Sequence, residues 1–155
     1  MVKVDAKDKK ILQALDRNGR LSIAEISRKT NIQRDSVIYR IKRMKKNGVI
    51  RFFHTVVSPS ALGYEIYSFV NFYLHNINPQ RENEFITYLR NHKNVVYLAK
   101  TTGKYDYKIS VAAKSLNEFD AILTGIRTNF SDIVKDYDTA SIIQEIKYDY
   151  MVDLI

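Results

Sequence analysis

A chain of 155 residues with a net charge of +8 and no cysteine excludes disulfide frameworks and thiolate metal sites. No apolar run approaches the roughly 18 residues that a membrane span needs, and the N-terminus lacks an apolar signal segment, so we expect a soluble, cytoplasmic protein with no membrane partner. Residues 1–57 contain 15 Lys and Arg against 5 Asp and Glu, whereas residues 58–155 contain 10 against 12. The net charge of +10 on the first part indicates a domain that meets a polyanion.

The first thirty residues predict two short helices. Asp5 can cap the first helix, and Asn18-Gly19 ends it with Gly19 in a left-handed conformation. Its apolar residues share one face: Ile11, Leu12, Ala14 and Leu15. Ser22 and Glu25 have the spacing of a capping box for the second helix. Asn31 suits the left-handed turn that follows.

A third helix is predicted from about Gln33 to Lys46, ending at Asn47-Gly48. Its buried stripe consists of apolar residues at i, i+4 and i+7: Val37, Ile41 and Met44. A helix, a short turn and a strongly basic third helix make a helix-turn-helix, which places its last helix in the major groove of double-stranded DNA.

The side of this helix that faces away from the stripe carries donors suited to guanine edges and phosphates. We expect Ser36, Tyr39 and Arg40 near bases, because base contacts come mostly from the N-terminal half of such a helix. Phosphate contacts are expected from Arg43, Lys45 and Lys46. The remaining predicted DNA-binding residues are Ser22, Arg34 and Lys42. The alternative interpretation is a basic helix face that only contacts solvent.

Residues 49–57 are rich in β-branched and aromatic side chains, which predicts a strand and therefore a winged helix-turn-helix. We place the first domain at residues 1–57, a hinge at residues 58–64 and a second domain at residues 65–155.

The second domain predicts alternating strands and helices. The expected strands are Glu65–His75, around Ile66, Phe69, Phe72 and Leu74, then Val95–Thr101, Tyr105–Ala113, and Ile133 to about Lys147. Helices are expected at Glu84–Asn91, after Asn78 as a possible cap, and after Ser115, where Glu118 suggests a second capping box. The order β-α-β-β-α-β is that of a ferredoxin-like unit, so the fold class is α+β.

Such a unit covers one face of its sheet with both helices and leaves the other face open. Aromatic residues of the strands cannot all fit beneath the helices: Tyr67, Phe69, Tyr73, Tyr97 and Tyr107. A second copy of the sheet would cover the open face, which predicts a two-fold homodimer.

The chain resembles the leucine-responsive regulatory protein and AsnC family along nearly its whole length. The residues that carry the resemblance include Asp8, Asn18-Gly19-Arg20, Arg40-Ile41, the hinge Ser58–Tyr64 and the turn Thr102-Gly103-Lys104-Tyr105-Asp106. This resemblance implies a transcription regulator that forms dimers or larger assemblies and binds an amino acid between subunits. The chain departs from the family at Asn31, at Gln33 and at residues 129–133.

A carboxylate beside a glycine turn with free N–H donors can hold the two charged groups of an amino acid. With the family resemblance, this predicts Thr102, Gly103 and Asp106 as effector-binding residues, with Thr139 and Ser141 as further candidates on the last strand.

The three histidines are scattered, and no phosphate loop or nucleophile elbow is present, so we expect no enzyme activity, cofactor or metal. Three hypotheses remain: an effector-responsive regulator, a ligand-independent architectural DNA-binding protein, and a subunit of an enzyme of amino-acid metabolism. The basic first domain argues against the third.

Overall fold

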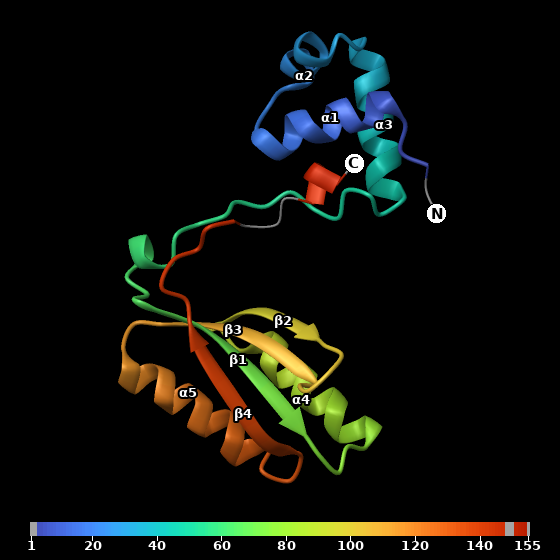
Figure 1. The fold of residues 1–155 in the computed structure, drawn as a ribbon. Helices are drawn as coiled ribbons and strands as arrows, with labels where there is room; N and C mark the ends of the chain where they lie inside the picture. The colour runs from blue at the N-terminus through green and yellow to red at the C-terminus, as the bar shows by residue number, and fades with distance from the viewer. Residues whose placement is uncertain (1–2, 148–150, 155) are drawn as a thin grey trace. The chain divides into compact units, whose positions relative to one another are not determined.

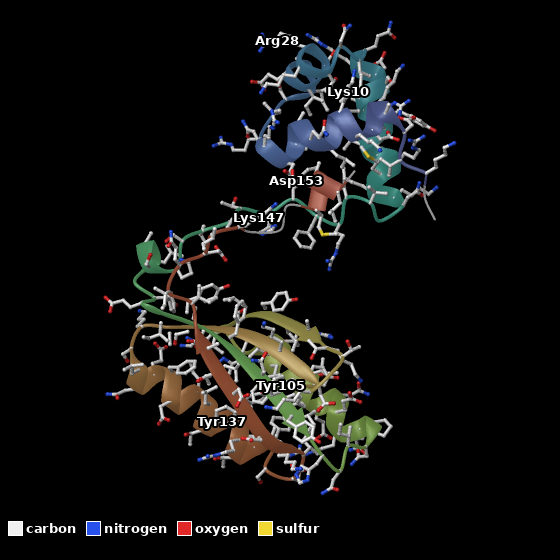
Figure 2. All side chains as sticks on the ribbon, in the orientation of Figure 1. Lys10, Arg28, Tyr105, Tyr137, Lys147 and Asp153 are labelled. Carbon is white, nitrogen blue, oxygen red and sulfur yellow. The ribbon has the colours of Figure 1, made fainter. Side chains whose placement is uncertain are left out.

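The computed structural model describes residues 3–147 and 151–154, which form two compact units. The first comprises residues 3–56 together with 146, 147 and 151–154, and the second comprises residues 57–145. The sequence had assigned everything after residue 65 to the second domain. The difference arises because Val152 packs against the core of the first unit. Within this C-terminal segment, Lys147 pairs with Asp153 at 3.1 Å (Figure 2).

Three helices make up most of the first unit: α1 (Ala6–Arg17), α2 (Ile23–Thr30) and α3 (Arg34–Lys46). A short 3-10 helix, Met151–Leu154, adds to them (Figure 1). Asp5 caps α1, and Ser22 and Glu25 form the predicted capping box of α2. Asn31 has φ 55° and makes the left-handed turn into α3.

The core of this unit joins all three helices through buried apolar side chains: Ile11, Leu12, Ile26, Ile32, Val37, Met44 and Ile50. Ile41, predicted to be buried with Val37 and Met44, is only half-buried. Gly19 does not take the predicted left-handed conformation, because the chain leaves α1 through extended backbone at Asn18.

The predicted wing strand at residues 49–57 does not form. Val49 and Ile50 instead turn back onto the helices, where both of their N–H groups donate to the carbonyl oxygen of Met44. The side chains that follow are more than half exposed, including those of Phe52, Phe53 and Val57. A strand requires a hydrogen-bonded neighbour as well as β propensity, and this segment has no ladder within the described part of the chain.

The second unit is an antiparallel sheet of four strands in the order β2-β3-β1-β4, which is the ferredoxin-like arrangement predicted (Figure 1). The strands are β1 (Ile66–Leu74), β2 (Val95–Lys100), β3 (Tyr107–Ala113) and β4 (Val134–Ser141). The helices are α4 (Pro79–Asn91) and α5 (Leu116–Asn129). A short 3-10 helix, Ser60–Leu62, lies in the predicted hinge and ends at Gly63 with φ 79°.

Both helices pack on one face of the sheet, in a core that contains Phe85 and Leu89 of α4 and Ile122 and Ile126 of α5. The strand residues beneath them include Val70 and Phe72 of β1 and, on β3, Tyr107, Ile109 and Val111. Phe69 lies on the opposite face of β1, since it is one residue from Val70. The sequence grouped Tyr107 with aromatic residues that cannot all fit beneath the helices. In the structure Tyr107 lies beneath them and is only 2% exposed.

Several predicted boundaries shift. The last strand ends at Ser141 instead of near Lys147, and α4 begins directly after its cap Asn78 instead of at Glu84. Ser115 caps α5, but the second capping box does not close, because the Glu118 carboxylate accepts the N–H of Lys114 at 2.6 Å. No helix in residues 3–147 or 151–154 combines the length and the apolar character needed to span a membrane.

Candidate nucleic-acid interface and effector site

Helix α3 is fixed to the first unit by its inner face. Val37 is fully buried and Met44 is 2% exposed, so the helix cannot rotate without opening the core. Asn31 redirects the chain just before it, and Gly48, with φ 71°, turns the chain away after it. Gln33, where the sequence departs from the family pattern, supplies no side-chain cap. Packing therefore sets the orientation of α3 more than its cap does.

The outer face of α3 carries side chains that the first unit leaves exposed. Tyr39 is 63% exposed and Ile38 40%. The exposed cations of this face are Arg34, Lys42, Lys45 and Lys46. Within residues 3–147 and 151–154 these four make no ion pair, although Lys45 lies 5.8 Å from the centre of the Phe53 ring. The sequence interpretation missed Ile38, which the helical period places beside Tyr39 and Lys42.

Two arginines predicted to contact DNA turn toward α1 instead. Arg40 Nη1 lies 2.7 Å from Asp5 Oδ2 and 2.8 Å from Asp8 Oδ1, and Arg43 Nη2 lies 2.5 Å from Asp8 Oδ2. We call these four residues the Asp–Arg cluster. The predicted placement of Arg40 among the base-reading side chains does not fit this geometry, because its side chain is only 16% exposed.

The cluster also shifts proton affinities. The hydrogen bond from Arg40 is the largest of the effects that lower the pKa of Asp5 from 3.8 to about 2. The same hydrogen bond raises the pKa of Arg40. Both groups therefore stay charged at every physiological pH.

Other predicted DNA contacts are partly engaged within the unit. The Ser22 hydroxyl and the Ser22 N–H donate to Glu25 Oε2 at 2.7 and 2.8 Å, and these two hydrogen bonds lower the pKa of Glu25. Ser36 is half-buried, and its hydroxyl oxygen lies 3.3 Å from Arg40 Nε. Of the nine predicted residues, the structure gathers Arg34, Tyr39, Lys42, Lys45 and Lys46 on one open face.

In the second unit, the predicted effector turn lies between β2 and β3. Thr102 and Gly103 are exposed, and Gly103 has φ 102°. Asp106 Oδ2 accepts the N–H of Leu74 at 2.8 Å, and the Asp106 N–H donates to the carbonyl oxygen of Phe72 at 2.9 Å. Asp106 therefore joins the turn to the end of β1, where β1 and β4 shift register.

Thr139 and Ser141 lie away from this turn. Thr139 pairs with Val70 and Ser141 with Ser68, whereas Asp106 reaches Leu74. At about 3.3 Å per residue, they lie roughly 13 and 20 Å along the strand from Leu74. Ser141 Oγ and Ser68 Oγ form a hydrogen bond of 2.9 Å. One chain does not bring the five predicted effector residues together.

A neighbour that the sequence interpretation missed is Asp138 on β4. The Tyr105 hydroxyl donates to its carboxylate, and Lys104 Nζ lies 3.6 Å from Asp138 Oδ2. Figure 2 labels Tyr105 at the turn and Tyr137, whose ring centre lies 6.1 Å from that of Phe72 in the core. No local pattern marks Asp138, because its contacts reach across 33 residues. Among the described residues, no group of three His, Asp or Glu side chains is placed to hold a metal ion.

Comparison with known proteins decides the family. Residues 4–51 match the family model described as winged helix-turn-helix DNA-binding, and residues 68–152, more than half of the chain, match the one described as Lrp/AsnC ligand binding domain. The chain belongs to the Lrp/AsnC family. It is a transcription regulator with a helix-turn-helix DNA-binding domain followed by an Lrp/AsnC ligand-binding domain, and it is not an enzyme.

Relatives with named roles agree with this family assignment. The chain is 33% identical over 120 residues to the HTH-type transcriptional regulator FL11 of Pyrococcus furiosus, covering 77% of this chain and 78% of the relative. The regulator NMB0573 of Neisseria meningitidis, solved as a complex with L-Met, has a TM-score of 0.84 at 24% identity, covering 94% of each chain. AsnC of E. coli has a TM-score of 0.81 at 24% identity, covering 97% of this chain and 99% of that one. These two structures share the fold of the Lrp/AsnC chain described here.

Proposed function

We propose that this Lrp/AsnC regulator reads a specific operator with the outer face of α3, as a homodimer whose affinity for DNA changes when an amino acid binds the second unit. The observation that carries the proposal is the exposed face with Tyr39 and four cations that lack carboxylate partners in the described chain. Because the partner is chromosomal DNA, we place the protein in the cytoplasm.

Position along α3 divides the DNA contacts. Arg34 and Tyr39 stand on its N-terminal half, from which recognition helices reach base edges. Lys42, Lys45 and Lys46 stand on the C-terminal half, where contact with phosphates fixes the position of the helix without reading sequence. Ile38 adds an apolar contact suited to a thymine methyl group.

The open face of the sheet supports the homodimer. Tyr97 is 52% and Tyr73 40% exposed on it, and Tyr67 and Phe69 are half-buried. Aromatic side chains contribute most where they are buried, so a second sheet packed against this face would stabilise the pair. A two-fold dimer also supplies two copies of α3 for two half-sites about one helical turn apart, or a multiple of that distance.

The turn Thr102–Asp106 is our proposed effector site. Its exposed glycine turn offers backbone N–H groups to a carboxylate, and Asp106 offers a carboxylate to an ammonium group. The match to a ligand-binding domain and the L-Met complex of NMB0573 support an amino acid as the ligand. Thr139 and Ser141 can contribute only from a second copy, because they lie far along the strand from the turn.

The test is a titration of the full chain against DNA upstream of its own gene, with and without a mixture of the twenty amino acids. A change in affinity or stoichiometry is expected, and splitting the mixture then identifies the effector. Asp106→Asn keeps an acceptor for the Leu74 N–H but removes the charge, so it should abolish the response and leave the dimer intact. A response that survives in Asp106→Asn would place the effector elsewhere.

One observation favours the second candidate, a ligand-independent architectural DNA-binding protein. Asp106 already accepts the Leu74 N–H, so its carboxylate has a structural role within the chain that requires no ligand. This candidate predicts weak sequence preference and the same titration curve with and without amino acids. The absence of DNA binding would contradict both candidates.

A further inference from the structure

Among the residues that the structure describes, Asp8 is the one buried Asp, Glu, Lys, Arg or His. Its two carboxylate oxygens receive one guanidinium each, from Arg40 and Arg43, and Oδ2 also accepts the N–H of Asp5 at 3.1 Å. The side chain of Asp8 is 1% exposed, so water cannot replace these partners.

This geometry commits both arginines to the first unit. A buried carboxylate that loses its cations is strongly destabilising, because its charge remains without solvent or partner. Moving the Arg40 or Arg43 guanidinium from Asp8 to a DNA phosphate would therefore lower the stability of the first unit. Arg40 is held further by Asp5, whose Oδ1 and Oδ2 lie 2.8 and 2.7 Å from its Nη1.

We propose that Asp8, assisted by Asp5, withholds Arg40 and Arg43 from DNA phosphates and thereby limits the affinity of the recognition helix for DNA of any sequence. The proposal rests on the proposed function only in requiring that α3 faces DNA. It assigns Asp8 a role in specificity although Asp8 contacts no nucleic acid.

The physical reason is the sequence independence of phosphate contacts. Each cation that neutralises a phosphate releases counterions, which strengthens binding to every duplex and steepens its salt dependence by about 0.9 per contact. A regulator depends on the ratio of specific to non-specific affinity, because non-specific sites outnumber its operators. Holding two guanidinium groups against α1 keeps the position of α3 fixed and removes two contacts that every duplex would offer.

The experiment compares two substitutions in the full chain that raise the net charge equally. Asp8→Asn removes the charge that holds the arginines, and Asp16→Asn removes an exposed carboxylate on the same helix that makes no ion pair in the described residues. Affinity for a duplex of random sequence is measured between 50 and 300 mM salt. We expect Asp8→Asn to steepen the slope of log affinity against log salt by about two and to bind at least tenfold more tightly at low salt, with little change in Asp16→Asn.

Two further variants keep the test decisive. If Asp8→Asn does not fold, as judged by its circular dichroism, Asp5→Asn replaces it, because Asn caps a helix as well as Asp does and the change frees Arg40 in part. Arg43→Ala should flatten the slope by about one in the Asp8→Asn background and by less than that in the unsubstituted chain.

Equal slopes for Asp8→Asn and Asp16→Asn would overturn the proposal, as would full flattening by Arg43→Ala in the unsubstituted chain. Lys42→Ala separates this failure from a failure of the proposed function. If α3 faces DNA, Lys42→Ala flattens the slope whatever the role of Asp8. If Lys42→Ala also has no effect, α3 is not the DNA-binding helix.

Discussion

The Lys and Arg side chains of the two units differ in the groups that they contact. In the second unit, Arg81 binds both Asp132 oxygens and Glu84 and lies 4.6 Å from the centre of the Phe130 ring. Lys100 pairs with Glu82 at 2.7 Å, and Lys108 lies 4.0 Å from the centre of the Phe69 ring. On the outer face of α3, by contrast, four cations without a carboxylate partner in the described chain stand together on one side of a single helix.

This difference teaches that unpaired cations grouped on one helix face, more than the number of charges, mark the interaction surface. Even within α3 the rule separates Arg40 and Arg43, which carboxylates neutralise, from Lys42 and Lys46, which they do not. A polyanion such as DNA binds where unpaired cations share one helix face. Substitutions in the two units can test whether α3 is such a surface.

The largest expected effect is on DNA binding by the unpaired cations. The double substitution Lys42→Ala with Lys46→Ala should weaken binding to all duplexes by roughly tenfold per residue at 0.1 M salt and flatten the salt slope by about two. The matched control is Lys114→Ala with Lys135→Ala, which removes two cations of the second unit that lie over aromatic rings. Equal losses in both double variants, measured by fluorescence anisotropy, would show that net charge alone matters.

A smaller effect, confined to specific DNA, is expected at Tyr39. Tyr39→Ala should lower operator affinity by roughly tenfold while leaving random-sequence affinity nearly unchanged, because we propose that its exposed ring meets base edges. Tyr39→Phe separates the hydroxyl from the ring, and a loss only in Tyr39→Ala would assign the effect to the apolar contact of the ring. If operator and random DNA suffer equally from Tyr39→Ala, this side chain does not read sequence.

In the second unit, removal of a paired cation should lower the stability of the fold and leave the affinity for DNA unchanged. Arg81→Ala removes the contacts that join α4 to residues 129–132, including a 2.5 Å hydrogen bond to the carbonyl oxygen of Asn129. The midpoint of thermal unfolding should fall by several degrees, with random-sequence affinity unchanged. Arg90→Ala, an exposed cation of the same helix without an ion pair in the described chain, is the control and should change neither quantity.

The smallest effect is a pH dependence of stability from Asp5. Its pKa is lowered to about 2 in the folded chain, so its contribution to stability is complete above about pH 4 and is lost as the pH falls through about 2. Asp5→Asn should lose less stability than the unsubstituted chain between pH 5 and 2, measured by thermal unfolding. The difference between the two chains is the measure, since Glu84 and Asp132 also have lowered pKa values. Parallel curves would mean that the Asp5–Arg40 pair contributes nothing.

Local signals predicted most of the fold. Asp5, Ser22, Asn78 and Ser115 were each identified as caps from residue type and spacing, and each accepts the expected backbone N–H. The order of the ferredoxin-like strands followed from periodicity, and Asn31 was identified as the left-handed residue. These features depend on residues within a few positions of one another.

The features that the sequence did not predict lie where distant residues decide. The pairing of Arg40 with Asp5 spans 35 residues, and no helical wheel of α3 contains the carboxylates that turn it inward. Residues 49–57 have β propensity but no partner strand in the described chain, and Ile143, predicted on the last strand, is fully exposed beyond its end. The roles of the predicted DNA and effector residues stay predictions until the titrations are made.

The hydrogen bond between Asp106 and Leu74 sets a limit on how tightly the turn can hold a ligand. An ammonium group that draws Oδ2 away from the Leu74 N–H leaves this partly buried N–H without its acceptor, at a cost of about 1–3 kcal/mol, or roughly 5- to 150-fold in the dissociation constant. A ligand that uses only Oδ1 avoids this loss. At the proposed site, a molecule that displaces Oδ2 would therefore be sensed only when it is abundant. Its binding would also loosen the end of β1, so the loss that weakens the affinity would report that the ligand has arrived.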